Sequence, residues 1–457
     1  MTTRDGWNSR ANVALALLIL INLFNYIDRQ ILAAVESRIE KTFFSEEEYP
    51  YVPGTKTRVD STIEAKMGLL NTAFMLTYIL IAPVFGLLAD RVPRWLLVGI
   101  GVIAWSLATG ATGLAGTFTI LLLTRCLVGV GEAAYGPAAP TMIADLFPVE
   151  NRGRMMAMFY MAIPVGSALG YVLGGQVTAW AGGVGEAWRW AFYVVVPPGI
   201  LLGIWCFLMR DPPRAKVSGQ GGARNASWRD YLHILKTPSY TINTAGMTAM
   251  TFALGGMAFW MPRYAERRGA GELDEVNVLF GIIVVVSGLT GTIVGGILGD
   301  LLKPRIKGAY FVVSAAAMAL AFPFILCVLW TPFPAAWVFV FFACFCLFFN
   351  TGPTNTILAN VTHPATRASA FALNILIIHA LGDAISPTLI GLINGVSGDM
   401  NMGFLAVSFL CLVGAGLWLI GAKYVDRDTE AISALGEPSK DPIQTEPFPV
   451  PPGSPQT

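Results

Sequence analysis

The sequence predicts an all-α membrane protein in which twelve transmembrane helices form two pseudo-symmetric halves of six. Three observations lead to this fold. The 457-residue chain is 54% apolar and only 13% charged, whereas soluble domains carry about 25% charged residues. It contains twelve apolar stretches of membrane-spanning length. Short motifs of the first six stretches also return in the last six, about 210 residues later.

The apolar stretches are each close to the length of about 20 residues that a helix needs to cross a bilayer. They cover roughly 11–34, 66–89, 94–115, 118–141, 155–180, 190–209, 239–261, 277–299, 307–330, 335–358, 368–394 and 402–422. Basic residues concentrate in the loops on the side of the two termini, and the opposite loops carry the acidic run 46–48. By the positive-inside rule we expect a multi-pass protein of the inner (cell) membrane with both termini in the cytoplasm.

Four segments follow from these spans. Residues 1–209 form the first six-helix half and residues 239–424 form the second. Residues 210–238 between them are a cytoplasmic linker, whose stretch from Trp228 to Lys236 is amphipathic and suited to the membrane surface. Residues 425–457 are expected to be a disordered cytoplasmic tail, because they are polar and rich in proline.

The internal repeat defines the relation between the halves. The run from Gly86 to Asp90 after the second span returns 210 positions later as the run from Gly296 to Asp300 after the eighth. Arg152 likewise returns 215 positions later as Arg367. Two parallel halves with a substrate site between them near the bilayer midplane are a known transporter plan.

Two opposite charges lie inside the fourth span. Arg125 and Glu132 are seven residues apart and therefore share one helical face. A charge at the bilayer centre costs about 2.5–3.5 kcal/mol on insertion scales, so this face is expected to border a cavity. Asp28 in the first span lies about 12 Å below the outer surface and Arg125 about 10 Å. The two can therefore pair if their helices adjoin.

Other polar residues share this depth. Glu132 and Asn25 are level near the midplane, as is Asp383 in the eleventh span, with His379 one turn away at i,i+4 spacing. Each feature has a structural alternative. The charges of spans one and four could form a static ion-pair network, the His379–Asp383 pair could be a packing hydrogen bond, and Arg29 could extend toward the membrane surface. Tyr26 and Asn374 are further candidates for cavity lining.

Several function classes are excluded. No basic run interleaved with aromatic residues suggests nucleic-acid binding, and no ATP-binding loop is present. The six cysteines all fall in apolar spans without metal-ligand spacing, so neither a metal nor another cofactor is expected. No nucleophile–base set is visible, which argues against an enzyme. Energy for transport would have to come from an ion gradient or from the gradient of the substrate.

The run from Gly86 to Arg94 resembles the loop signature between helices 2 and 3 of the major facilitator superfamily, although Pro93 stands where glycine is usual. The segment from Arg125 to Ala133 resembles the helix 4 signature of the same superfamily. The resemblance covers about residues 11–422 and implies a clasp that latches the cytoplasmic face in the outward-open state. The candidate gating residues are Gly86, Asp90, Arg91, Arg94, Arg152, Gly296, Asp300 and Arg367.

A narrower resemblance is to the Spinster family. It is carried by the phrases from Asn22 to Arg29, from Gly129 to Ala133 and from His379 to Pro387. It implies a secondary active transporter that moves an amphiphilic, lysolipid-like anion of the lysophospholipid or sphingosine-phosphate type by alternating access. The carboxylates in the apolar spans make protons the expected coupling ion, and we expect a monomer. Its partners would be that lipid-like substrate, protons and membrane lipids.

In this interpretation Arg125 attracts the anionic head group, and Asp28 or Glu132 exchanges a proton. The alternatives are a transporter of water-soluble organic anions or drugs on the same fold, and a lipid sensor or scramblase. The candidate residues for substrate and proton binding are Asn25, Tyr26, Asp28, Arg29, Arg125, Glu132, Asn374, His379 and Asp383.

Overall fold

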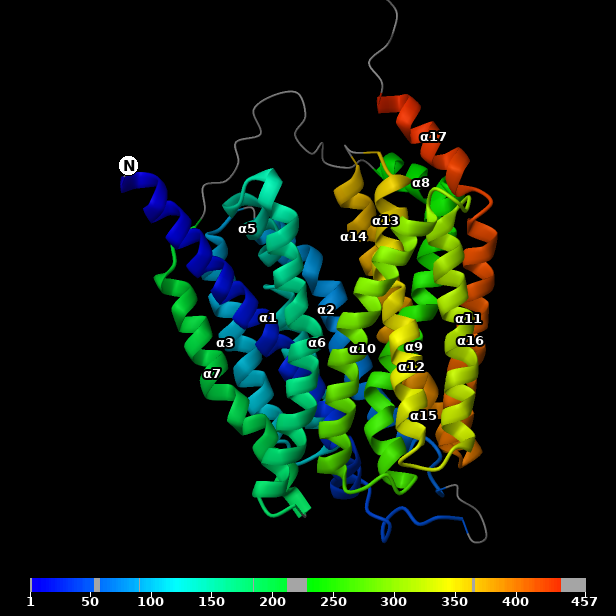
Figure 1. Cartoon of the computed structure of the whole chain (residues 1–457). Coiled ribbons are helices and arrows are strands. Elements are labelled where there is room, and N and C mark those ends of the chain that lie inside the picture. Colours follow the sequence, from blue (N-terminus) through cyan, green and yellow to red (C-terminus); the bar gives the residue numbers. More distant parts are fainter. Residues whose placement is uncertain are drawn as a thin grey trace, which may run out of the picture.

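The computed structural model describes residues 2–52, 58–89, 91–183, 185–211, 228–363 and 366–436, and these ranges fold almost entirely into helices (Figure 1). The first half comprises α1 (Thr2–Phe43), α2 (Ile63–Ala89), α3 (Arg94–Gly113), α4 (Phe118–Ala133), α5 (Ala138–Leu146), α6 (Val149–Trp180), η1 (Gly185–Trp188) and α7 (Arg189–Leu208). The second half comprises α9 (Pro238–Arg267), α10 (Leu273–Leu302), α11 (Ala309–Trp330), α12 (Ala336–Phe349), α13 (Thr351–Asn360), α14 (Arg367–Ile378), η2 (His379–Asp383), α15 (Ser386–Ser397) and α16 (Met400–Gly421).

Twelve helical units cross the bundle, as the sequence predicts. Eleven of those in the described ranges are long and apolar enough to span a membrane. The twelfth is α9, whose 30 residues extend about 45 Å at 1.5 Å per residue. It is more polar than the others because side chains such as Asn243 and Thr244 are buried against neighbouring helices rather than exposed to lipid.

Three of the spans are interrupted. The fourth is divided into α4 and α5 around Gly136 and Pro137, and the tenth into α12 and α13 at Asn350, beside Gly352 and Pro353. These breaks lie at equivalent positions of the two halves, in agreement with the repeat in the sequence. The eleventh span contains a turn of π-helix, η2, between α14 and α15. Such turns are frequent at functional sites.

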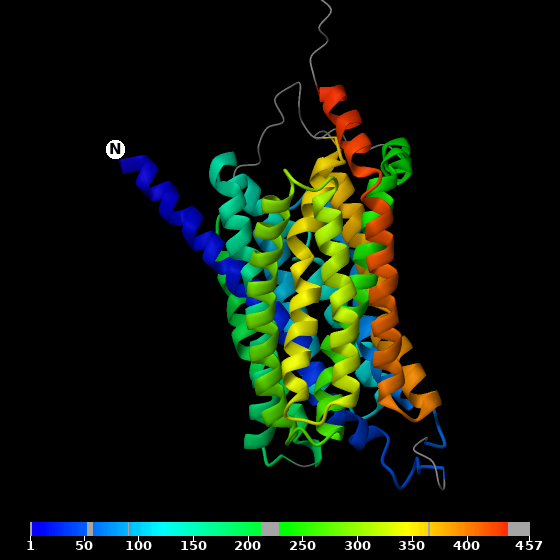
Figure 2. The ribbon, with the colours of Figure 1, turned by 45° about the vertical axis from the view of Figure 1, so that its right-hand side comes forward.

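The bundle has two distinct ends. The N-terminus, α8 (Trp228–Lys236) and α17 (Val425–Gly436) lie at one end, here called the terminal face (Figures 1 and 2). The opposite end is the far face, where α1 ends and α2 begins. The stretch predicted to be amphipathic is the helix α8. The first part of the tail predicted to be disordered is the helix α17, in which Asp428 accepts a hydrogen bond of 3.0 Å from the backbone N–H of Ser239 at the start of α9. The rest of that tail, 437–457, lies outside the described residues.

The two halves meet near the far face. The main contacts are α2 against α15, α6 against α10 and α1 against α9. Tyr171 of α6 donates to the Ala258 carbonyl at 2.6 Å, and Asn277 of α10 donates to the Ala34 carbonyl at 2.9 Å. Each of these four residues lies within ten positions of the far end of its helix. This conformation is therefore closed at the far face.

Glycine permits one close helix contact within the second half. A Cβ atom on Gly295 would overlap the carbonyl oxygen of Phe349, whereas a Cβ on the adjacent Gly296 would meet nothing within 4 Å. Overpacking of this kind costs about 1–3 kcal/mol. We expect Gly295→Ala to lower the thermal midpoint in detergent by about 1–3 °C. Gly296→Ala is the matched control, and an equal effect of the two substitutions on the midpoint would contradict this packing.

Candidate functional site

A cavity of about 200 Å³ lies between the two halves. Helices α1, α2 and α6 contribute its first wall, and α9, α10, α12 and η2 contribute the second. Most of the lining is aromatic or aliphatic, and the polar groups are few. The lining includes Tyr26, Arg29, Gln30, Asn71, Phe74, Met75, Ser167, Tyr171, Met257, Phe259, Phe280, Val284, Cys344, Phe348, His379 and Asp383.

Arg29 is the cation of the first wall. Its Nη2 and Nε atoms lie 2.8 and 2.9 Å from Oε2 of Glu132 on α4. The guanidinium also stands over the rings of Tyr26, Phe74 and Tyr78, at 5.0, 5.0 and 5.4 Å from their centroids. The Arg29 side chain is 17% exposed and that of Glu132 is fully buried. Arg29 therefore faces the cavity and does not extend toward the membrane surface, because Glu132 and the three rings hold it.

Arg125 and Asp28 lie behind this wall. Each is 1% exposed and neither lines the cavity. The predicted Asp28–Arg125 ion pair is not formed, because the Asp28 carboxylate instead accepts a hydrogen bond of 2.6 Å from the Thr109 hydroxyl of α3. Arg125 stands over the Phe74 ring at 5.4 Å, and its Nε and Nη1 atoms are buried without a hydrogen-bond partner in the described residues. A buried cation with unpaired donors lies one layer behind Arg29.

The second wall carries a histidine–carboxylate pair. Nδ1 of His379 lies 3.0 and 2.9 Å from the two carboxylate oxygens of Asp383. The i,i+4 contact expected from the sequence is thus present, although the turn that carries it is π-helical. Asn71 of α2 donates to the Asp383 carbonyl at 3.3 Å. The pair therefore lies at the point where the two halves touch, with both side chains partly exposed.

Two asparagines predicted at the site lie elsewhere. Asn374 is 1% exposed and donates a hydrogen bond of 2.9 Å to the Thr244 hydroxyl of α9. The expectation that it lines the cavity is wrong, since it joins α14 to α9. Asn25 is 4% exposed and does not line the cavity either. Position on a span could not distinguish the cavity side of a helix from its packed side.

The described residues of the predicted clasp at the terminal face contact their own half. Asp90 and the side chain of Arg152 lie outside the described residues. Asp300 accepts a hydrogen bond of 2.7 Å from the Tyr310 hydroxyl of its own half. Arg94 pairs with Asp145 at 2.5 Å, again within one half. These residues contact their own halves because the halves meet at the far face. Three further gating candidates are described. A Cβ atom on Gly86 would lie 3.9 Å from the Cβ of Pro137, and Arg91 is exposed. Arg367 donates a hydrogen bond of 3.4 Å to the Thr362 carbonyl.

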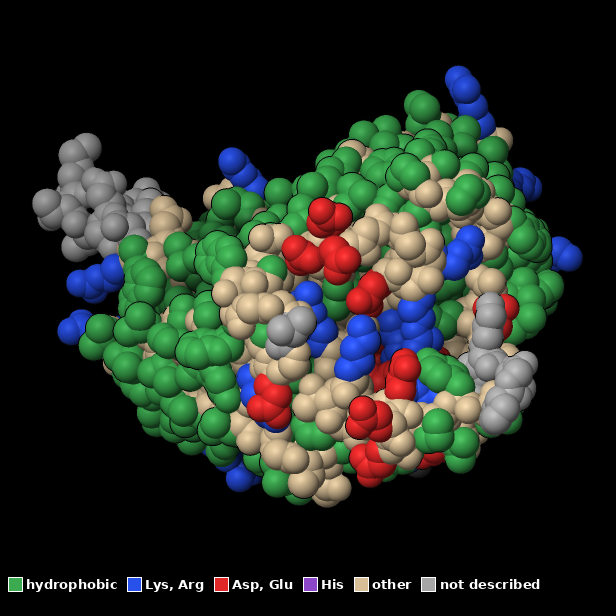
Figure 3. Space-filling view, turned by 90° about the horizontal axis from the view of Figure 1, so that it is seen from below, with side chains coloured by type: hydrophobic (Ala, Val, Ile, Leu, Met, Phe, Trp, Pro, Cys, Tyr) green, Lys and Arg blue, Asp and Glu red, His purple; other side chains and the backbone are tan. Residues whose placement is uncertain are grey.

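Sequence reasoning missed a cross-half ion-pair cluster near the far face, here called the far-face latch: Glu36, Glu40, Glu64, Arg263 and Arg267. Arg263 of α9 is 1% exposed and lies 2.7 Å from Glu36 and 3.3 Å from Glu64, and it also contacts Glu40. Arg267 lies 2.8 Å from Glu64. Seen from the far face, acidic and basic side chains gather in the middle and hydrophobic side chains surround them (Figure 3). The cluster ties α1 and α2 to α9 across the interface.

The family model of the Major Facilitator Superfamily matches residues 18–387. "Protein spinster homolog 3" of Danio rerio is 35% identical, with 93% of this chain and 88% of the relative covered. "Protein spinster homolog 1" of Homo sapiens is 35% identical, with 84% and 73% covered.

Solved structures show the same fold. A bacterial homologue of the human lysosomal transporter Spinster, in an inward-facing and occupied conformation, superposes with a TM-score of 0.78 at 20% identity, covering 92% of this chain and 98% of that one. The Escherichia coli xylose transporter XylE, in an inward-open conformation, gives a TM-score of 0.70 at 15% identity, covering 93% and 100%.

Proposed function

The chain belongs to the major facilitator superfamily and, within it, to the spinster family, and from this premise we propose that it transports an amphiphilic, lysolipid-like anion by alternating access. The observation that supports this most is the composition of the central cavity. One partly exposed cation, Arg29, stands in a lining that is otherwise largely aromatic and aliphatic. Such a site suits a molecule with one anionic group and an apolar chain.

Arg29 takes the anionic head group in this proposal. Its guanidinium offers a planar set of donors that fits a phosphate or carboxylate, and it reaches the cavity. The role expected for Arg125 changes accordingly. Arg125 lies behind Phe74, and its buried positive charge adds to the field that attracts the anion. Phe74, Phe280 and Phe348 contact the apolar part of the substrate.

The substrate anion and Glu132 compete for Arg29, and this competition couples substrate binding to protonation of Glu132. Glu132 is fully buried, and its only described cation at ion-pair distance is Arg29. A substrate anion that attracts the guanidinium weakens this pair. A proton on Glu132 then replaces the lost positive charge, because an unpaired buried carboxylate is strongly disfavoured. Asp28, held by Thr109, is the second candidate for proton exchange.

The conformation corresponds to the inward-open state of the proposed cycle. The basic loops favour cytoplasmic termini, which places the terminal face on the cytoplasmic side. The far face is then outside and closed by the far-face latch. The clasp residues at the terminal face, including Asp300, would make their cross-half contacts only in the outward-open state.

The two carboxylates give a testable prediction about pH. Asp28→Asn and Glu132→Gln remove the two candidate proton sites near the arginines, so we expect at least one of them to flatten the dependence of transport on pH. The measurement is the initial rate of uptake into proteoliposomes between pH 5.5 and 8.5. Asp426→Asn, at the start of α17, serves as the control. If both variants kept the pH profile of the wild type, neither carboxylate would be the coupling site.

Reconstitution tests the substrate class. Proteoliposomes with an imposed proton gradient are expected to accumulate a fluorescent lysophospholipid against its concentration gradient. Accumulation of water-soluble organic anions with no movement of the lysolipid would instead favour the second kind of transporter. Equilibration of lipid without uphill movement would identify a scramblase and contradict the proposal.

A further inference from the structure

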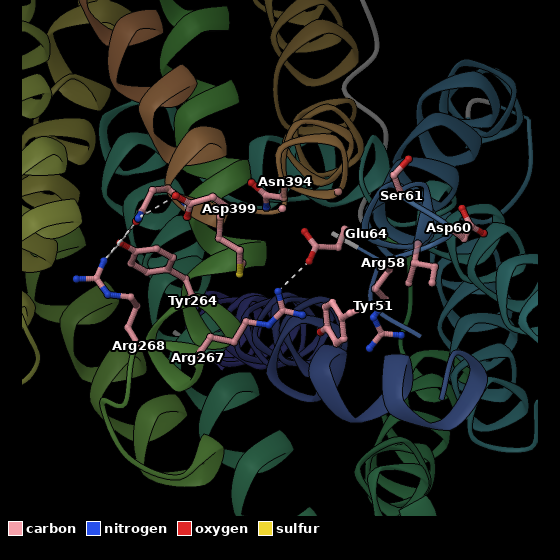
Figure 4. Close-up of a pocket in the computed structure, with 15 residues that line it drawn as sticks. Tyr51, Arg58, Asp60, Ser61, Glu64, Tyr264, Arg267, Arg268, Asn394 and Asp399 are labelled. Atoms are coloured by element: carbon pink, nitrogen blue, oxygen red, sulfur yellow. Dashed lines mark hydrogen bonds and ion pairs between the residues drawn. The ribbon is translucent and has the colours of Figure 1, made fainter. Parts of the chain in front are cut away.

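The far face contains a second cavity, of about 560 Å³, which we call the far-face vestibule (Figure 4). Both halves line it: Tyr51 and several residues between Arg58 and Glu64 on one side, and the end of α9 with the junction of α15 and α16 on the other. Glu64 and Arg267 of the far-face latch form part of its wall. The latch therefore lies between the vestibule and the central cavity.

Most charges of the vestibule are neutralised within the protein. Arg267 pairs with Glu64 at 2.8 Å, and Arg58 pairs at 3.1 Å with Glu40 beneath the wall. Asp60 pairs with Lys66 at 2.6 Å. Slight desolvation of Asp60 is outweighed by hydrogen bonds from Lys66 and Thr62, which hold the pKa of this carboxyl at about 2. None of these pairs leaves a charge for a ligand.

Among the described lining residues, Arg268 and Asp399 are the two charges outside these pairs. Within the described ranges, the Arg268 guanidinium donates only to neutral oxygens: the Tyr264 hydroxyl, the carbonyls of Leu329 and Thr331, and Oδ1 of Asn401. Asp399 accepts from the backbone N–H of Asn401 at 2.9 Å as the N-cap of α16, and no described cation pairs with it. The Asn401 amide lies between the two, with Oδ1 3.3 Å from Arg268 and Nδ2 3.5 Å from Asp399.

A buried amide in the same lining is unsatisfied. Asn394 of α15 is 1% exposed, and neither its Oδ1 nor its Nδ2 has a hydrogen-bond partner in the parts of the chain that are described. A buried polar group without a partner costs about 1–3 kcal/mol. The Asn394 Oδ1 lies against Gly403 of α16, so this amide is enclosed in the helix packing beside the vestibule.

We propose that the far-face vestibule binds a zwitterionic group, with its phosphate or carboxylate at Arg268 and its ammonium at Asp399. The opposite charges of Arg268 and Asp399 favour a zwitterionic ligand. An anion alone would leave Asp399 unpaired beside it, and a cation alone would meet Arg268. The source is a soluble zwitterion or the head group of a lipid at the membrane surface, which share this chemistry. The site does not depend on the substrate of the central cavity.

Calorimetry on the purified full-length chain tests the site with O-phosphoethanolamine as the probe, and with inorganic phosphate and ethanolamine as separate ligands. We expect the zwitterion to bind at least tenfold more tightly than either fragment. Arg268→Gln and Asp399→Asn should each weaken its binding at least tenfold. Asparagine is a good N-cap, so the second variant keeps α16. Arg268→Lys keeps the charge and should retain part of the affinity, which separates loss of charge from loss of fold.

Two controls locate the binding. Arg305→Gln, an exposed residue of the terminal face, and Arg29→Gln in the central cavity should leave the affinity for phosphoethanolamine unchanged. Loss of binding in Arg29→Gln alone, equal affinity for phosphate and the zwitterion, or unchanged affinity in both vestibule variants would each overturn the proposal. The same titration with lysophosphatidylethanolamine in nanodiscs, made on the Arg29→Gln variant so that the central cavity does not contribute, identifies the source: tighter binding than the soluble probe assigns a lipid head group, and equal binding assigns a soluble zwitterion.

Discussion

Replacing Arg263 with glutamine is expected to open the far face. This side chain is almost fully buried and contacts three carboxylates of the other half, Glu36, Glu40 and Glu64. Removing one partner of a buried ion pair costs about 3–5 kcal/mol, because the remaining charge stays buried and unpaired. In the open state the same carboxylates reach water. Since every 1.4 kcal/mol is about a tenfold change in an equilibrium constant, the ratio of open to closed molecules should rise at least about a hundredfold.

Electron–electron distances across the far face measure this shift. Spin labels at Val59 and Val396, both highly exposed, report the separation of the halves in a background without the six native cysteines. Arg267→Gln is the matched control one turn along the same helix. Its side chain is 38% exposed, and pairs of this kind contribute about 0–1 kcal/mol. Equal distance distributions in Arg263→Gln and the wild type would show that the latch does not hold the face closed.

Arg29→Gln is expected to abolish most transport of an anionic amphiphile. Arg29 is the cation that the cavity presents, and the substitution leaves Glu132 buried without its partner. The bound substrate anion also loses its charged partner, which costs about 2–5 kcal/mol, so the rate should fall at least about tenfold. Arg29→Lys should retain part of it, because the charge remains while the planar set of donors is lost.

A double variant separates binding from folding. Arg29→Gln combined with Glu132→Gln removes the unpaired carboxylate and should recover the thermal stability lost in the single variant, while transport stays low. Recovery of transport in the double variant would contradict a direct role of Arg29 with the substrate. It would show that Arg29 acts only by neutralising Glu132.

The fold could be predicted from the sequence because its signals are local and repeated. Each span is an apolar run of fixed minimal length, and the second half repeats the motifs of the first. The span of α9 can also be predicted although it is more polar, because its buried polar residues are flanked by apolar ones. The contacts between helices follow less directly. The helical rise places Asp28 and Arg125 at the same depth, but the Asp28 carboxylate accepts its hydrogen bond from the Thr109 hydroxyl of α3 instead.

The far-face latch shows where this kind of reasoning fails. The first and seventh predicted spans end at residues 34 and 261, just before Glu36 and Arg263. The charges end each apolar run, yet helices α1 and α9 continue to Phe43 and Arg267. They continue because the charges neutralise each other across the interface and need not leave the protein. Charged pairs at i,i+4 spacing just beyond two apolar runs were the available signal.

Native mass spectrometry of the protein released from membranes tests the central claim most directly, namely that Arg29 holds an anionic amphiphile between the halves. The wild type is expected to retain one lysophospholipid-sized anion, and Arg305→Gln should retain it equally. Arg29→Gln should lose it while remaining folded and monodisperse. Retention of the same lipid at the same occupancy in Arg29→Gln would contradict the account.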